Sequence, residues 1–220
     1  MQAIKWVVEQ NVDVISISWG LLKKSENIAE ALREAHSNNV VIVAAAGNYG
    51  KRHPIAFPAN FQNYVICVGA ADGDGITLPI TARETDQGQD LEKFTAPGKA
   101  VNCASICLST WDWWTHLQSF IAQEGYLGRT EHVTGTSMAT PIAAGIAALF
   151  IQYTRYPQNK CNDAKSHDSM LKLFSAMCKD KGETFRFLVP WNLLTNGDVQ
   201  SFVINVRAAL IAGNITFILV

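Results

Sequence analysis

The sequence predicts an α/β protein with three layers, a parallel sheet covered by helices on both faces. Short apolar runs of strand length, at residues 12–17, 40–45 and 65–68, alternate with amphipathic helical patterns. The run at 40–45 is apolar without alternation, as expected for a strand buried on both faces. Hydrophobic residues make up 48% of the 220 residues and charged residues 17%, which is enough for one domain with a sizeable core.

The first elements follow from hydrophobic periodicity. A helix from residue 3 to about residue 11 is followed by a β-branched strand at 12–17. A second helix is predicted after Asn27, which forms a capping pattern with Glu30 three residues later. The apolar stripe of that helix consists of Ile28, Ala31, Leu32 and Ala35.

The later elements are less regular. Residues 72–75 predict a turn, and because Arg83 stands where a calcium loop needs Glu, no metal site is expected. Residues 81–93 are polar and loop-like, and 110–129 fit no periodic template. Residues 137 to about 153 are nearly all apolar or small, which predicts a helix buried on every side. We expect a core at residues 1–156 and a carboxyl-terminal extension at 157–220 that packs on it.

The charge balance argues against two classes of partner. Lys and Arg number 18 against 19 Asp and Glu, so neither nucleic acid nor a membrane surface is an expected partner. The amino terminus lacks a signal-peptide pattern, and the most apolar segments are shorter than the roughly 20 residues of a spanning helix. The five cysteines contain no CxxC pair, which favours thiols over a zinc site or disulfide framework. These features favour a cytoplasmic chain without a cofactor.

Two short segments carry candidate chemistry. Ser137 lies in the Gly135–Pro141 segment at the start of the apolar helix, where unpaired backbone N–H groups can stabilise an oxyanion. The alternative is that Thr136 or Ser137 simply caps the helix. Asn48 ends the Ala45-Ala46-Gly47-Asn48 turn after the strand at 40–45, at the sheet edge where ligands gather in parallel sheets. The alternative there is an ordinary Gly-Asn turn.

These segments together resemble the subtilisin-like serine peptidases. Gly-Thr-Ser-Met-Ala-x-Pro at residues 135–141 is similar to the nucleophile signature of that family. Four further segments resemble the family in the same order along the chain, namely residues 3–20, 40–48, 57–70 and 94–98. The match covers residues 3 to about 150 and implies the subtilisin-like three-layer fold.

The resemblance also implies roles for particular residues. Ser137 would be the nucleophile, and Asn48 would bind the oxyanion together with the Ser137 N–H. The residues expected to border the substrate cleft and pair with an extended peptide are Ser18, Trp19, Gly20, Ala46 and Gly47. Asp13 is expected to be a structural acid.

Two parts of the family's triad are missing from the sequence. The triad runs Asp, His, Ser along the chain, and its Asp-(Ser/Thr)-Gly and His-Gly-Thr-His motifs occur nowhere in residues 1–220. The resemblance therefore implies the carboxyl-terminal part of a catalytic domain, truncated at its amino-terminal end and exposed at one sheet edge. None of the five histidines carries a family motif, and His53 and His132 are the least remote candidates for a replacement base.

Two functions are compatible with this sequence. The first is a serine-type endopeptidase acting on peptide or protein substrates, incomplete or inactive as it stands, whose Asp and His come from a missing amino-terminal segment. The alternative is a degenerate, non-catalytic module of the same family that acts in protein interaction or regulation. A nucleotide-binding protein is not expected, because the sequence has neither GxGxxG nor GxxxxGK[ST].

Overall fold

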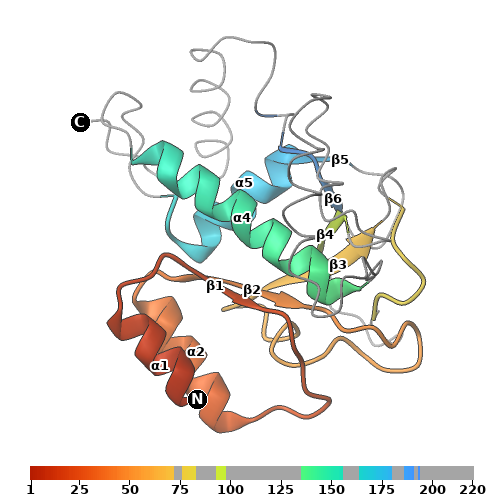
Figure 1. Ribbon diagram of the computed structural model, residues 1–220, viewed down its shortest axis with the longest axis horizontal. Coiled ribbons are helices and arrows are strands. Elements are labelled where there is room, and N and C mark those ends of the chain that lie inside the picture. Colours follow the sequence, from red (N-terminus) through yellow and green to blue (C-terminus); the bar gives the residue numbers. More distant parts are fainter. Residues whose placement is uncertain are drawn as a thin grey trace, which may run out of the picture.

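A computed structural model describes residues 1–71, 76–82, 93–97, 135–155, 164–179, 186–190 and 193 (Figure 1). Its strands are β1 (Val14–Ile17), β2 (Val41–Ala45), β3 (Ile66–Ala71), β4 (Lys93–Pro97), β5 (Cys178–Lys179) and β6 (Arg186–Leu188). Its helices are α1 (Gln2–Glu9), α2 (Glu26–Ser37), α4 (Thr136–Thr154) and α5 (His167–Met177).

The strands form one sheet in the order β1-β2-β3-β4-β6-β5 within the described residues. All neighbouring pairs are parallel except β5 and β6, which are antiparallel. In β2 the successive side chains alternate between the two faces, and all five are buried. The predicted parallel α/β class is therefore confirmed, and β1 forms one edge of the sheet.

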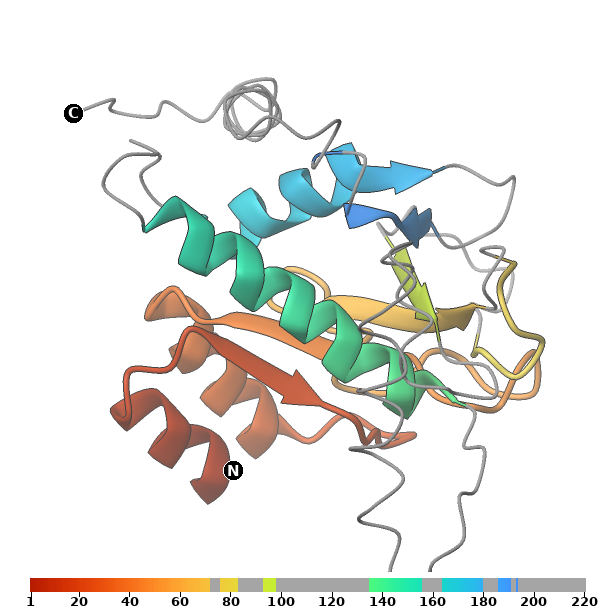
Figure 2. The same cartoon turned by 45° about the horizontal axis from the view of Figure 1, so that its top comes forward.

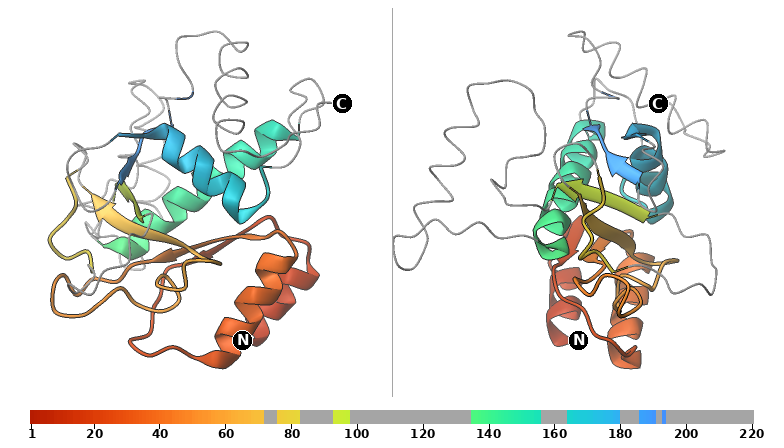
Figure 3. Two further views of the ribbon diagram at one scale, coloured as in Figure 1. Left: turned by 180° about the vertical axis from the view of Figure 1, so that it is seen from behind. Right: turned by 90° about the vertical axis from the view of Figure 1, so that its right-hand side faces the viewer.

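Helices cover both faces of the sheet, as predicted (Figures 2 and 3). On one face α1 and α2 pack with Ile42 and Ala44 of β2. On the other face α4 and α5 pack with Val41 and Val43 of the same strand. The sheet is therefore the middle of three layers, and each face has its own apolar core.

Three expectations about element boundaries are wrong. The helix α2 begins at Glu26 after Ser25, so the predicted Asn27 and Glu30 capping pair lies inside the helix. The polar segment predicted as loop ends in β4, which starts at Lys93 and pairs with β3. The third strand extends to Ala71. Backbone pairing and packing, rather than the local sequence pattern, decide where these elements begin and end.

The expectation that the apolar helix is buried on every side is also wrong. One side of α4 packs against β1, β2, β3 and β4. Its other side carries five exposed residues, Pro141, Gly145, Ala148, Leu149 and Gln152. Apolar composition alone does not show how many sides of a helix are covered.

Several predicted features lie outside the described residues. These include the turn at 72–75, the segment 110–129, and Cys103, Cys107 and Cys161. Cys67 and Cys178 are described, and both carry thiols. The boundary between residues 156 and 157 stays a prediction, although α5 packs in the same apolar core as α4.

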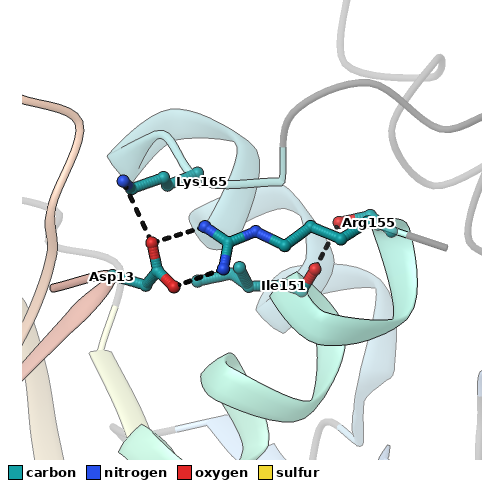
Figure 4. Close-up of polar contacts among 5 residues, drawn as sticks. Asp13, Ile151, Arg155 and Lys165 are labelled. Atoms are coloured by element: carbon teal, nitrogen blue, oxygen red, sulfur yellow. Dashed lines mark hydrogen bonds and ion pairs between the residues drawn. The ribbon is translucent and has the colours of Figure 1, made fainter. Parts of the chain in front are cut away.

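Asp13 joins the start of β1 to the end of α4 (Figure 4). Arg155 donates to both carboxylate oxygens of Asp13, at 2.6 and 2.5 Å, and the Lys165 ammonium lies 3.0 Å from Oδ1. The Arg155 guanidinium holds the pKa of Asp13 below its ordinary value of 3.8, and Lys165 acts in the same direction against the effect of burial. These contacts support a structural role for Asp13.

Replacing Asp13 with Asn is expected to reduce stability in a pH-dependent way. Because the folded-state pKa is lowered, the ion pair contributes above pH 3.8 and is lost as the pH falls through the folded-state pKa. At pH 7 the loss should be about 1 kcal/mol, since the partners are partly exposed and screened. Urea unfolding at pH 7 and pH 3 measures this difference.

The matched control is Glu26→Gln, because Glu26 forms more exposed ion pairs and also has a lowered pKa. Its effect at pH 7 should be smaller than that of Asp13→Asn. If Asp13→Asn lowers the free energy of unfolding equally at both pH values, the loss does not come from the ionised Asp13 carboxylate, and the role given to its ion pair is wrong.

Candidate active site

Ser137 lies in the first turn of α4 and bonds to Ser18, the residue after β1. The amino end of α4 lies beside the carboxyl end of β1 (Figure 2). The N-cap position belongs to Gly135, which has no side chain to form a capping hydrogen bond. The alternative in which Thr136 or Ser137 caps this helix is therefore excluded. The first-turn N–H groups of a helix have no intrahelical acceptor, so the Ser137 amide faces a site with positive potential.

A hydrogen-bond network joins Asn48 to the residue before Ser137. The Asn48 side-chain oxygen accepts from the Thr136 N–H at 2.9 Å and from the Thr136 hydroxyl at 3.0 Å. The Thr136 hydroxyl oxygen in turn accepts from the Gly47 N–H at 3.2 Å. With its oxygen held by Thr136, the Asn48 amide must direct its N–H groups away from Thr136.

The backbone at Gly135 makes room for Asn48. A Cβ atom at residue 135 would lie 2.8 Å from Asn48 Nδ2, closer than real Cβ contacts allow. In the described part of the chain, the exposed Asn48 Nδ2 donates to no acceptor. The site therefore keeps an amide N–H available beside the amino end of α4, as an oxyanion site requires.

Ser18 and Ser137 form two reciprocal hydrogen bonds. The Ser137 hydroxyl donates to the Ser18 carbonyl at 2.8 Å, and the Ser18 hydroxyl donates to the Ser137 carbonyl at 2.9 Å. Ser18 directly follows β1, so these bonds connect that strand to the first turn of α4. The predicted nucleophile thus lies within contact of the predicted cleft border.

The residues expected to border the cleft fall into two groups. Ser18, Trp19 and Gly20 are exposed, and among the described residues the main chain of Trp19 and Gly20 makes no hydrogen bond. Ala46 is fully buried, and its N–H and C=O bond to Val68 and Ala56. The main-chain groups of Gly47 are bonded to Thr136 and Ala82.

Gly20 is required by close packing. A Cβ on Gly20 would lie 2.6 Å from the Ala56 side chain. The adjoining residues Leu21 and Phe57 form an antiparallel bridge with hydrogen bonds of 2.7 and 2.8 Å. Thus the segment after β1 is anchored on the chain that follows the Asn48 turn.

The described histidines do not contact Ser137. The His36 ring packs against the rings of Tyr64 and His167. His36 precedes β2, so His36 and His167 lie at the opposite end of the strands from Ser137. His53 packs on Tyr49 in the loop after Asn48. His116 and His132 lie outside the described residues. In the portion of the chain described, no three His, Cys, Asp or Glu residues form a cluster suited to a metal ion.

The residue that sequence reasoning missed is Thr136. The sequence predicts for it only the role of a helix cap, whereas its hydroxyl and N–H hold Asn48. Its position next to the candidate nucleophile was the available signal. Sequence spacing could not reveal that Thr136 bonds to Asn48, since the two residues are 88 positions apart in the chain.

Comparisons with known proteins give one consistent family. The model described as "Subtilase family" matches residues 1–173. The chain is 31% identical to a thermostable alkaline protease of Halalkalibacterium halodurans, over 74% of this chain and 37% of that protein. It is 28% identical to subtilisin DY of Bacillus licheniformis, over 85% of this chain and 57% of that protein.

Solved structures agree on the fold. A mutant of the protease domain of PatA has a TM-score of 0.63 and 23% identity, covering 97% of this chain and 65% of that chain. The chain therefore spans about a third to two thirds of the length of these similar proteins.

Replacing Thr136 with Val is expected to destabilise the site, because it leaves the Gly47 N–H and the Asn48 oxygen each with one partner fewer. The free energy of unfolding should fall by about 1 kcal/mol, the typical net contribution of a hydrogen bond, because these hydrogen bonds are only partly buried. Thr136→Ser keeps the hydroxyl and is the matched control. A loss in Thr136→Ser as large as that in Thr136→Val, measured by denaturant unfolding, would contradict the role assigned to the hydroxyl, because the serine variant retains it.

Proposed function

The chain belongs to the subtilase family, and on that premise we propose that it carries the nucleophile half of a serine endopeptidase site. Ser137 is the nucleophile, and Asn48 with the Ser137 N–H forms the oxyanion site. The observation that carries this proposal is the Asn48–Thr136 network, which holds an amide donor beside the first turn of α4.

The reaction follows from these positions. The Ser137 oxygen attacks the carbonyl carbon of the scissile peptide, and the carbonyl oxygen becomes an oxyanion. That oxyanion accepts hydrogen bonds from Asn48 and the Ser137 N–H, two donors already oriented before the reaction. The exposed main chain of Trp19 and Gly20 pairs with an extended peptide or protein substrate.

The general base must come from residues that do not contact Ser137 here. At present the Ser137 hydroxyl donates to the Ser18 carbonyl, which cannot take up its proton. We propose that an amino-terminal segment with the family's Asp and His, in the same chain or a separate one, completes the site. The open edge of β1 and the exposed face of α4, with Gly145 and Leu149, are where that segment would pack.

A non-catalytic module is the second candidate. It is favoured by one observation, that among the described residues neither a histidine nor a carboxylate bonds to Ser137. A module of this kind would keep the fold and bind protein partners without cleaving them. It predicts that biological activity survives the loss of the Ser137 hydroxyl.

Replacing Asn48 with Ala should lower kcat for a peptide substrate about 10²- to 10³-fold, the effect known for the oxyanion asparagine of a subtilisin. KM should change little, because the lost donor acts mainly on the transition state. Ser137→Ala should abolish turnover. The kcat and KM of both variants are measured by steady-state peptide cleavage in the full-length protein.

Asn38→Ala is the matched control, because the Asn38 amide also donates a hydrogen bond, to the Glu34 carbonyl, but lies before β2 at the other end of the strands. It should retain kcat. Full biological activity in Ser137→Ala would refute the peptidase proposal and support the non-catalytic module.

A further inference from the structure

Pro141 removes one hydrogen bond from the turn of α4 that carries Ser137. In a regular helix the carbonyl of residue 137 accepts from the N–H of residue 141. Residue 141 is a proline inside α4, so that donor does not exist. The Ser137 carbonyl therefore needs another partner, because an unsatisfied backbone acceptor that is partly shielded from water costs free energy.

Ser18 supplies that partner from outside the helix. Its hydroxyl donates to the Ser137 carbonyl at 2.9 Å, across a separation of 119 positions in the chain. The bond originates just beyond the last residue of β1, so it ties the helix turn to the sheet. The interaction is therefore a substitute for a helix hydrogen bond that also crosses between two elements.

We propose that Ser18 is a positioning residue for Ser137, whose hydroxyl replaces the N–H that Pro141 lacks and holds the nucleophile's backbone in register with Asn48. The consequence for catalysis rests on the proposed function, whereas the replacement of the helix hydrogen bond does not. Both rest on the geometry of Ser18, Ser137 and Pro141.

Of the two hydrogen bonds between Ser18 and Ser137, one must break during a reaction and the other can remain. The Ser137 hydroxyl must leave the Ser18 carbonyl when it turns to give its proton to a base. The bond from the Ser18 hydroxyl ends on a main-chain oxygen, so it persists while the Ser137 side chain rotates. The backbone of the nucleophile is thereby held still, and small misplacements of reacting groups cost large factors in rate.

A double-mutant cycle tests the replacement. Ser18→Ala deletes only the hydroxyl, since alanine keeps the carbonyl that accepts from Ser137. Pro141→Ala restores the N–H, and Pro141 is exposed, so little packing is lost. Ser18→Ala should lower Tm by about 2–4 °C with Pro141 present. In the Pro141→Ala background its effect should fall below about 1 °C, because the helix then supplies its own donor.

Hydrogen exchange of the Thr136 amide reports positioning without any need for activity. That amide donates to Asn48, so loosening of the first turn should expose it more often. Ser18→Ala should speed its exchange about fivefold with Pro141 present and less than twofold in the Pro141→Ala background. Ser18→Thr keeps a hydroxyl and should restore slow exchange.

Ser37→Ala provides the matched control. The Ser37 hydroxyl donates to the Arg33 carbonyl at 2.9 Å, the same type of bond in a helix without a proline. Its Tm effect should be the same in both backgrounds. Equal Ser18→Ala effects in both backgrounds, in Tm or in Thr136 exchange, would overturn the proposal.

Labelling of Ser137 by a fluorophosphonate in the full-length protein then separates this proposal from the proposed function. Ser18→Ala should slow labelling about three- to tenfold, and Ser18→Thr should recover it. Coupled Tm and exchange effects with unchanged labelling would overturn the positioning role. A wild-type protein that is not labelled at all would count against the proposed peptidase, while the exchange cycle would still decide the role of Ser18.

Discussion

The attachment of α4 to β1 at both ends is the constraint on which the site depends. The helix has no charged side chain between Thr136 and Thr154, so it is stable only when packed against an apolar surface. Hydrophobic packing has little directional preference, but the polar contacts at the two ends have a defined geometry. Ser137 bonds to Ser18 after the strand, and Arg155 bonds to Asp13 before it. These contacts orient the helix antiparallel to β1.

This orientation brings the amino end of α4 to the carboxyl ends of the parallel strands. Unpaired N–H groups of the first helical turn therefore meet the loop that follows β2, which contains Asn48. Thr136 holds the oxygen of the Asn48 amide, and Gly135 leaves the space that its nitrogen occupies. The proposed oxyanion site needs donors that are fixed before charge develops, and the packing of α4 holds these groups in place.

The first turn of α4 lacks one helix hydrogen bond because of Pro141, and a hydrogen bond from outside the helix takes its place. The proline removes a donor one turn after Ser137, and the sheet compensates through Ser18. The first turn of α4 is consequently coupled to β1 more strongly than a regular helix would be. At the other end, the Asp13 ion pair responds to pH, so the two attachments differ in their sensitivity to conditions.

The fold class, the early elements and the candidates Ser137 and Asn48 could be predicted from the sequence, because apolar periodicity and contiguous motifs are local properties. The start of α2, the strand β4 and the exposed face of α4 could not, since they depend on which backbone groups and faces find partners. The candidates for the proposed chemistry could thus be named from contiguous motifs alone. The bonds from Thr136 to Asn48 and from Ser18 to Ser137 could be found only in the folded structure, because they join residues 88 and 119 positions apart, and contacts at such separations leave no periodic pattern in the sequence.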